Sequence, residues 1–129
     1  MKSISLVNAG ALLIAALVPT LAAAESLDGR SFQGVFIERG KTSGDADTLV
    51  FKDGRFRSSA CDQYGYSDAT YKTVATGDTV RFEAETASPK YGKLFWTGTI
   101  HGSKLDASVM MERKGKPMLE NWVVAAEKN

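Results

Sequence analysis

The stretch that decides the fold is residues 79–112, TVRFEAETASPKYGKLFWTGTIHGSKLDASVMME. Apolar and charged side chains alternate along its first part, where Val80, Phe82 and Ala84 are separated by charged residues. A strand with one buried face produces this period of two, whereas the apolar positions of a helix recur every three or four residues. The segment therefore predicts antiparallel strands that share one buried face.

Three dipeptides mark tight turns between segments of this kind. They are Asp53-Gly54, Gly77-Asp78 and Gly102-Ser103. Each contains a glycine, which supplies the positive φ that a two-residue hairpin turn of type I′ or II′ requires. Together with one apolar segment on either side, they predict eight strands. These strands are expected at residues 31–38, 48–52, 55–59, 68–76, 79–85, 93–101, 104–112 and 118–126.

Eight short strands joined in sequence predict an all-β fold, an eight-stranded antiparallel up-and-down meander closed into a small barrel. Closure removes both sheet edges, which would otherwise pair with other chains. A flattened barrel or a two-sheet sandwich is the structural alternative. The expected register places Phe82, Trp96 and Val109 in the core. It places Arg81 and Glu83 outside, where an outer-membrane barrel would need apolar side chains.

The connections between these strands alternate in expected length. In a meander the three tight turns share one end of the barrel with both termini, and the other connections share the opposite end. Those longer connections are expected at residues 39–47, 60–67, 86–92 and 113–117. Because loops on a rigid scaffold carry most binding residues, we expect any functional site at the end with the long loops.

The first residues predict a secretory signal peptide at residues 1–24, followed by a single β-barrel domain at residues 25–129. A short basic start, an apolar run over residues 9–18 and the sequence Ala22-Ala23-Ala24 form the pattern that signal peptidase cleaves. We expect cleavage before Glu25, a periplasmic or secreted location and a mature chain that does not span a membrane. A retained membrane anchor is the alternative.

Charge and cysteine content narrow the class of protein further. The chain has 16 Lys and Arg against 15 Asp and Glu, and loss of the signal removes Lys2, so the mature charges balance. We therefore expect no nucleic-acid partner, because phosphate binding needs a basic excess. The single cysteine, Cys61, excludes an internal disulfide, so stability is expected to come from packing and the strand hydrogen bonds.

In its predicted strand order and loop pattern, the chain resembles the calycin, or lipocalin-like, barrels, and in particular small secreted bacterial proteins of that shape whose roles are mostly uncharacterised. The resemblance covers the architecture of nearly all of the mature chain. Lipocalins carry Gly-x-Trp on their first strand, whereas residues 28–34 read DGRSFQG, without the Trp. The resemblance implies a cup for a hydrophobic ligand and assigns no ligand residue.

The expected ligand-binding residues come from two of the long connections. Tyr64, Tyr66 and Cys61 lie in the third connection, and Lys90 and Tyr91 lie in the fifth. Tyrosine rings suit the apolar part of a ligand, and ammonium groups suit an acidic head. Ordinary loop composition is the alternative interpretation. The other two long connections add further lysines, which are Lys41, Lys114 and Lys116.

The residues able to carry chemistry form no catalytic or metal-binding set, so we expect no catalytic residue, metal, cofactor or enzymatic activity. His101 is expected at the tight end, far from Cys61, which separates the two members of a Cys–His pair. Cys61 is either a functional thiol or a small packed residue, and Asp62 should raise its pKa. Asp45 and Asp47 lack the further oxygen ligands of a calcium loop and are expected in a solvated loop.

The sequence is compatible with two functions. The first is a barrel that binds a small, partly apolar or amphipathic ligand at its long-loop end. The second is a protein–protein interaction module, whose barrel would be filled and would contain no cavity. Small residues expected on the inward face favour the first function because they leave room inside the barrel. These residues are Ala69, Ala84, Gly98 and Ala107.

Overall fold

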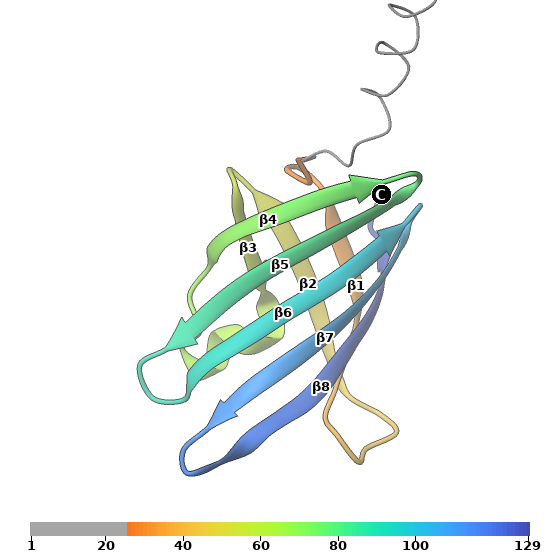
Figure 1. The fold of residues 1–129 in the computed structure, drawn as a ribbon. Coiled ribbons are helices and arrows are strands. Elements are labelled where there is room, and N and C mark those ends of the chain that lie inside the picture. Colours follow the sequence, from red (N-terminus) through yellow and green to blue (C-terminus); the bar gives the residue numbers. More distant parts are fainter. Residues whose placement is uncertain (1–25) are drawn as a thin grey trace, which may run out of the picture.

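A computed structural model describes residues 26–129, and these residues form a closed barrel of eight antiparallel strands. The strands are β1 (Ser31–Ile37), β2 (Asp45–Lys52), β3 (Arg55–Ser58), β4 (Ala69–Thr76), β5 (Thr79–Ser88), β6 (Gly92–His101), β7 (Lys104–Arg113) and β8 (Lys116–Glu127). Each strand pairs with the next, and β8 pairs with β1 (Figure 1). The predicted closed meander is confirmed. The predicted signal peptide lies outside the described residues.

The three predicted hairpin turns are present, and the residues that flank each turn pair directly across it. Asp53 and Gly54 both have positive φ, at 53° and 74°, as a type I′ turn requires. The end of β8 lies beside these turns, because the Glu127 N–H donates to the Ser103 carbonyl at 2.7 Å. The tight turns and the described chain ends therefore share one end of the barrel, here called the closed end.

The segment before β1 seals the closed end. Leu27 is fully buried, and its backbone N–H donates to the Tyr71 hydroxyl at 2.9 Å. That hydroxyl donates to Asp28 Oδ1 at 2.6 Å, and the Gly54 N–H donates to the same carboxylate at 3.0 Å. These contacts fix Leu27 as a plug beneath the core, so this end offers no entrance to the barrel.

Aromatic side chains fill the half of the barrel above this plug. The rings of Phe51 and Phe82 meet edge to face at a centroid distance of 5.0 Å, and those of Phe56 and Trp96 meet at 4.8 Å. The predicted register is confirmed, because Phe82 and Val109 are fully buried and Trp96 is 1% exposed. Trp96 also satisfies its buried indole N–H, which donates to Thr86 Oγ1 at 3.1 Å.

The small inward residues do not provide the expected room for a ligand. A Cβ placed on Gly98 would lie 2.1 Å from Phe82 Cε1, so the ring of Phe82 already occupies that space. Ala107 is buried in the core, and Ala84 is partly buried against it. Small residues here accommodate large neighbouring rings, which is why the closed half is filled.

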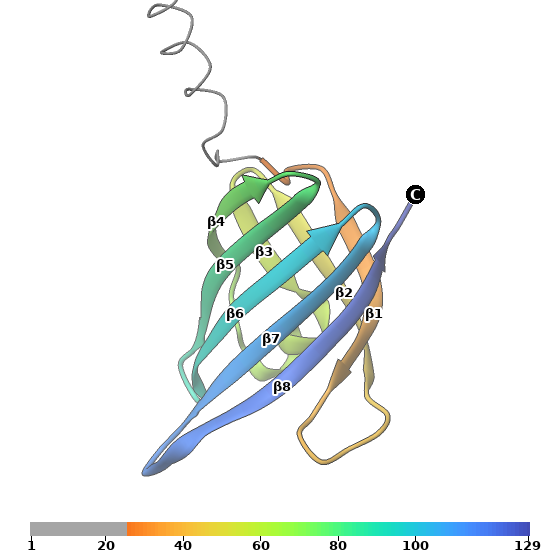
Figure 2. The same cartoon turned by 45° about the vertical axis from the view of Figure 1, so that its right-hand side comes forward.

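Two of the four connections predicted to be long are tight turns. The pairing of β5 with β6 continues to Ser88 and Gly92, so only residues 89–91 join them. Only residues 114–115 join β7 to β8. Gly92 and Gly115 have φ of 84° and 68°, and this positive φ permits the tighter reversals. Figure 2 shows the β7–β8 hairpin extending past the neighbouring strands at the end opposite the plug, here called the open end.

Candidate functional site

A cavity of about 720 Å³ lies at the open end of the barrel. Its deepest apolar residues include Phe36, Leu94 and Met111, which pack on the aromatic core. Phe36 meets Trp96 edge to face at a centroid distance of 6.1 Å, so the filled half forms the floor of the cavity. The barrel is therefore solid at one end and hollow at the other.

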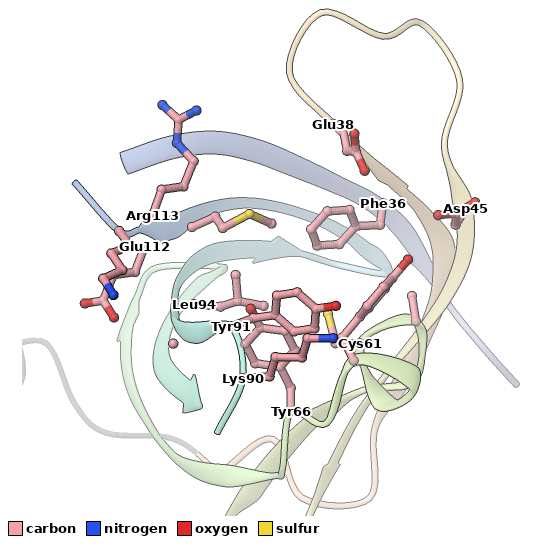
Figure 3. A pocket seen from close by; sticks show the side chains of 15 residues that line it. Phe36, Glu38, Asp45, Cys61, Tyr66, Lys90, Tyr91, Leu94, Glu112 and Arg113 are labelled. Atoms are coloured by element: carbon pink, nitrogen blue, oxygen red, sulfur yellow. The ribbon is translucent and has the colours of Figure 1, made fainter. Parts of the chain in front are cut away.

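The five predicted ligand-binding residues all line this cavity (Figure 3). Cys61 and Tyr64 belong to the 3-10 helix η2 (Ser59–Tyr64), and Tyr66 follows it. Lys90 and Tyr91 come from the turn between β5 and β6. The rings of Tyr64 and Tyr91 meet edge to face at a centroid distance of 5.8 Å, so the two segments are in contact.

The cavity also contains residues that the sequence did not single out. The apolar residues Phe36, Leu94 and Met111 lie on strands, where alternation alone does not distinguish a cavity wall from a packed core. The charged residues of the rim are Glu38, Asp45, Glu112, Arg113 and Lys114, of which only Lys114 was expected there. Of the other two lysines, Lys41 pairs with Glu38 at 3.2 Å, and Lys116 is not part of the cavity wall.

A buried carboxylate holds η2 in place beside the cavity. Asp47 is 3% exposed and accepts hydrogen bonds from Ser58 Oγ at 2.7 Å, from the Ala60 N–H at 3.0 Å and from Ser59 Oγ at 3.3 Å. The prediction of a solvated loop for Asp45 and Asp47 is wrong for Asp47. Because β2 begins at Asp45, Asp47 occupies an inward position of the strand, while Asp45 stays exposed at the rim.

Cys61 is buried, and its Sγ lies 3.3 Å from Ser58 Oγ. The pKa of the thiol is raised from 9.0 to about 11, mainly by burial; the hydrogen bond with Ser58 opposes this shift, and the carboxylates of Asp47 and Asp62 add to it. The expected direction of the Asp62 effect is confirmed, although burial is the larger cause. At neutral pH Cys61 therefore lines the cavity as a protonated thiol with little nucleophilic character.

Ser88 joins the two segments that carry the predicted residues. Its hydroxyl donates to the Tyr64 carbonyl at 2.7 Å, which links β5 to η2. The same oxygen accepts from the backbone N–H groups of Lys90 and Tyr91, both at 3.3 Å. Ser88 is 5% exposed, so these bonds are shielded from water. The sequence predicted a connection at residues 86–92, but it did not indicate this cross-link.

The rim carries both signs of charge, distributed unevenly. Glu38 and Asp45 lie on one side of the opening, and Glu112 and Arg113 lie on the other (Figure 3). Arg113 Nε donates to the Pro117 carbonyl at 2.9 Å. Lys90 forms no ion pair within residues 26–129, and its Nζ lies 5.3 Å from the centroid of the Tyr91 ring.

His101, which the sequence places at the end opposite Cys61, lies at the closed end. It is exposed, and its Nε2 is 3.0 Å from Asp78 Oδ2, an interaction that lowers the pKa of Asp78. His101 therefore forms no pair with Cys61. Among residues 26–129, no group of three or more His, Cys, Asp or Glu side chains is arranged to hold a metal ion. Over the same range no helix is long and apolar enough to cross a membrane.

No protein-family model, curated protein sequence or solved structure matches the chain. The class of the protein is therefore defined by its own fold and site. It is a closed, eight-stranded antiparallel β-barrel with a solid aromatic half and a cavity at the opposite end.

Proposed function

We propose that the protein is a lipocalin-like barrel of the periplasm or extracellular space that binds a small, partly apolar ligand in its open-end cavity. The observation that carries this proposal is the cavity of about 720 Å³. Small-molecule sites typically occupy roughly 300–1,000 Å³ and combine apolar walls with a few polar groups. A barrel used only as a scaffold for protein contacts would gain stability by filling that space.

The chemistry of the cavity wall supports a ligand with an apolar body. Leu94, Met111 and Phe36 supply the apolar contact at its base. The ligand-binding residues in this proposal are Tyr64, Tyr66 and Tyr91, together with Lys90 and Cys61, and all five line the cavity. Tyrosine combines a large contact surface with a hydroxyl and loses little entropy when a ligand orders it.

A protein–protein interaction module is the second candidate function. It is supported by the exposure of Tyr64 and Tyr91, which are 47% and 46% exposed at the rim. Exposed tyrosines are common where proteins meet. A partner that binds these rings without entering the barrel would leave the cavity unused. The two functions therefore predict different responses to a small apolar probe.

Titration with the neutral fluorescent probe N-phenyl-1-naphthylamine tests the proposed function. We expect saturable binding by the mature protein, and a loss of affinity of about tenfold in the double variant Lys90→Ala, Tyr91→Ala. The matched variant His101→Ala, Lys104→Ala alters the closed end and should bind the probe normally. Absence of saturable binding, or a loss confined to the closed-end variant, would contradict a ligand site at the open end.

The proposed location depends on the signal sequence. Export to the periplasm or beyond follows from cleavage before Glu25, after the Ala22-Ala23-Ala24 sequence. N-terminal sequencing of the protein recovered from the periplasm or the medium should therefore begin at Glu25. Recovery of the protein only in the cell membrane, with Met1 retained, would instead support the anchor.

A further inference from the structure

Resting on the proposed function, we propose that the cavity selects single-chain amphipaths with an anionic head group, which Lys90 holds at the mouth while the tail occupies the apolar base. The proposal combines two features of one cavity, an apolar interior and a cation at its opening.

Lys90 is placed where a head group would emerge from the cavity. In Figure 3 its side chain lies within the opening, between the acidic residues Glu38 and Asp45 on one side and Glu112 with Arg113 on the other. Ser88 Oγ accepts the Lys90 N–H at 3.3 Å and donates to the Tyr64 carbonyl at 2.7 Å, so the backbone that carries Lys90 is fixed before any ligand arrives. Preorganisation of this kind reduces the entropy lost on binding.

The charge of Lys90 is not neutralised within residues 26–129. Its Nζ lies over the ring of Tyr91, 5.3 Å from the centroid, and makes no ion pair. Glu38, by contrast, already pairs with Lys41. Two other acidic residues, Asp45 and Glu112, also line the mouth, and the two basic residues Arg113 and Lys114 balance them in number. The opening therefore retains one central cation able to pair with an anion.

The groups beside Lys90 favour an anion as well. Tyr66 also lines the cavity, and its phenol hydroxyl is able to donate a hydrogen bond to an anion. Below the mouth, Leu94 and Met111 offer only apolar contact. A carboxylate bound deep in the cavity would lose its hydration there without a cation to replace it, whereas one at the mouth keeps contact with water. The head is therefore expected at the mouth and the tail at the base.

The test is displacement of N-phenyl-1-naphthylamine from the mature protein by three matched dodecyl compounds, used below their micelle-forming concentrations. Dodecanoate should displace the probe at about tenfold lower concentration than dodecanol, the gain expected for a hydrogen bond to a charged group. Dodecyltrimethylammonium should be the weakest competitor. The preference for dodecanoate should decrease as salt is added, because salt screens exposed charges.

The variant Lys90→Met keeps an unbranched side chain but removes the charge. We expect it to lose the preference for dodecanoate over dodecanol, with both compounds measured against the variant's own affinity for the probe. Lys104→Met, at the closed end, is the matched control and should keep the full preference. Thermal melting of both variants verifies that they fold. We expect melting temperatures close to that of the wild type, because both lysines are exposed.

The outcomes separate this inference from the proposed function. If the probe binds but dodecanoate and dodecanol compete equally, or if Lys90→Met keeps the preference, the cavity binds ligands and the assignment of an anionic head is wrong. If dodecyltrimethylammonium competes best, the acidic residues of the rim determine selectivity, and the assignment is again wrong. If the probe does not bind at all, the proposed function fails and this inference fails with it.

Discussion

The chemical properties of single residues at the open end depend on their positions in the barrel. Cys61 illustrates this, because its pKa of about 11 results mainly from burial and only then from neighbouring carboxylates. The sequence indicated the direction through the adjacent Asp62. It could not indicate the burial or the contribution of Asp47, because Asp47 lies on β2 and Cys61 lies in η2. The role of the thiol depends on contacts that only the fold creates.

The raised thiol pKa predicts a loss of stability at alkaline pH. Below about pH 9 the thiol is protonated in both the folded and unfolded states, so it contributes equally to both. Above that pH the unfolded chain loses the proton first, so the free energy of unfolding falls as the pH rises to about 11. The expected loss is up to about 2–3 kcal/mol.

Denaturant unfolding at several pH values, compared between the wild type and Cys61→Ala, isolates this effect from the other groups that titrate there. The variant should lack the part of the alkaline loss that the thiol causes. Parallel curves for the two proteins would show that the thiol ionises equally in both states. Labelling of the folded wild type by a thiol reagent at pH 7 should also be slow, because little thiolate is present.

At the scale of elements, β2, β3 and η2 act as one unit around Asp47. The carboxylate receives hydrogen bonds from Ser58, Ser59 and Ala60, which surround the start of η2. The Arg57–Asp62 ion pair adds a second link between β3 and η2 on the outer surface. These links position Cys61 and Tyr64 at the cavity, so the wall of the site depends on a buried strand residue.

Replacement of Asp47 by alanine should disrupt this unit. The change leaves the Ala60 N–H and the Ser58 hydroxyl without their acceptor, and we expect a loss of about 2–4 kcal/mol in the free energy of unfolding. Thiol labelling of Cys61 should become faster, because η2 would open more often. Asp45→Ala, two residues earlier and exposed at the rim, is the matched control and should cost less than about 0.5 kcal/mol. Similar costs for the two variants would contradict this account of η2.

The elements also show where sequence analysis succeeds and where it stops. Strand alternation and the three glycine turns predicted the closed meander, because both signals are local. The predicted long connections at residues 86–92 and 113–117 were wrong, because strand pairing continues to Ser88 with Gly92 and to Arg113 with Lys116. Whether Gly98 leaves a space or accommodates the Phe82 ring depends on a contact between neighbouring strands. That contact has no signature within either strand.

At the scale of the whole molecule, the barrel has a packed half and a hollow half. The closed half contains the Leu27 plug and the packed aromatic rings, and the open half contains the cavity. Empty space costs packing energy, so the closed half must supply a large share of the stability. The five predicted ligand-binding residues all lie in the open half, although only two of its four connections are long.

This division predicts that stability and probe binding respond to different substitutions. Phe82→Ala removes a fully buried ring and should cost about 3–5 kcal/mol in the free energy of unfolding. Glu83→Ala changes the adjacent outward residue and should be nearly neutral. At temperatures where both variants are folded, both should bind N-phenyl-1-naphthylamine as the wild type does. Equal effects of the two substitutions on chemical denaturation would contradict the assigned register.

The seam between β1 and β8 determines how the molecule can be attached to anything else. Arg30 pairs with Glu127 at 2.8 Å across this seam, and the Lys128 N–H donates to the Ser31 carbonyl at 2.8 Å. Both described chain ends therefore lie at the closed end of the barrel, on the side remote from the cavity. A fusion partner, a tether or an immobilising tag joined to either of these chain ends would hold the barrel by its sealed base. The cup would then face the surrounding solution, with its entrance unobstructed.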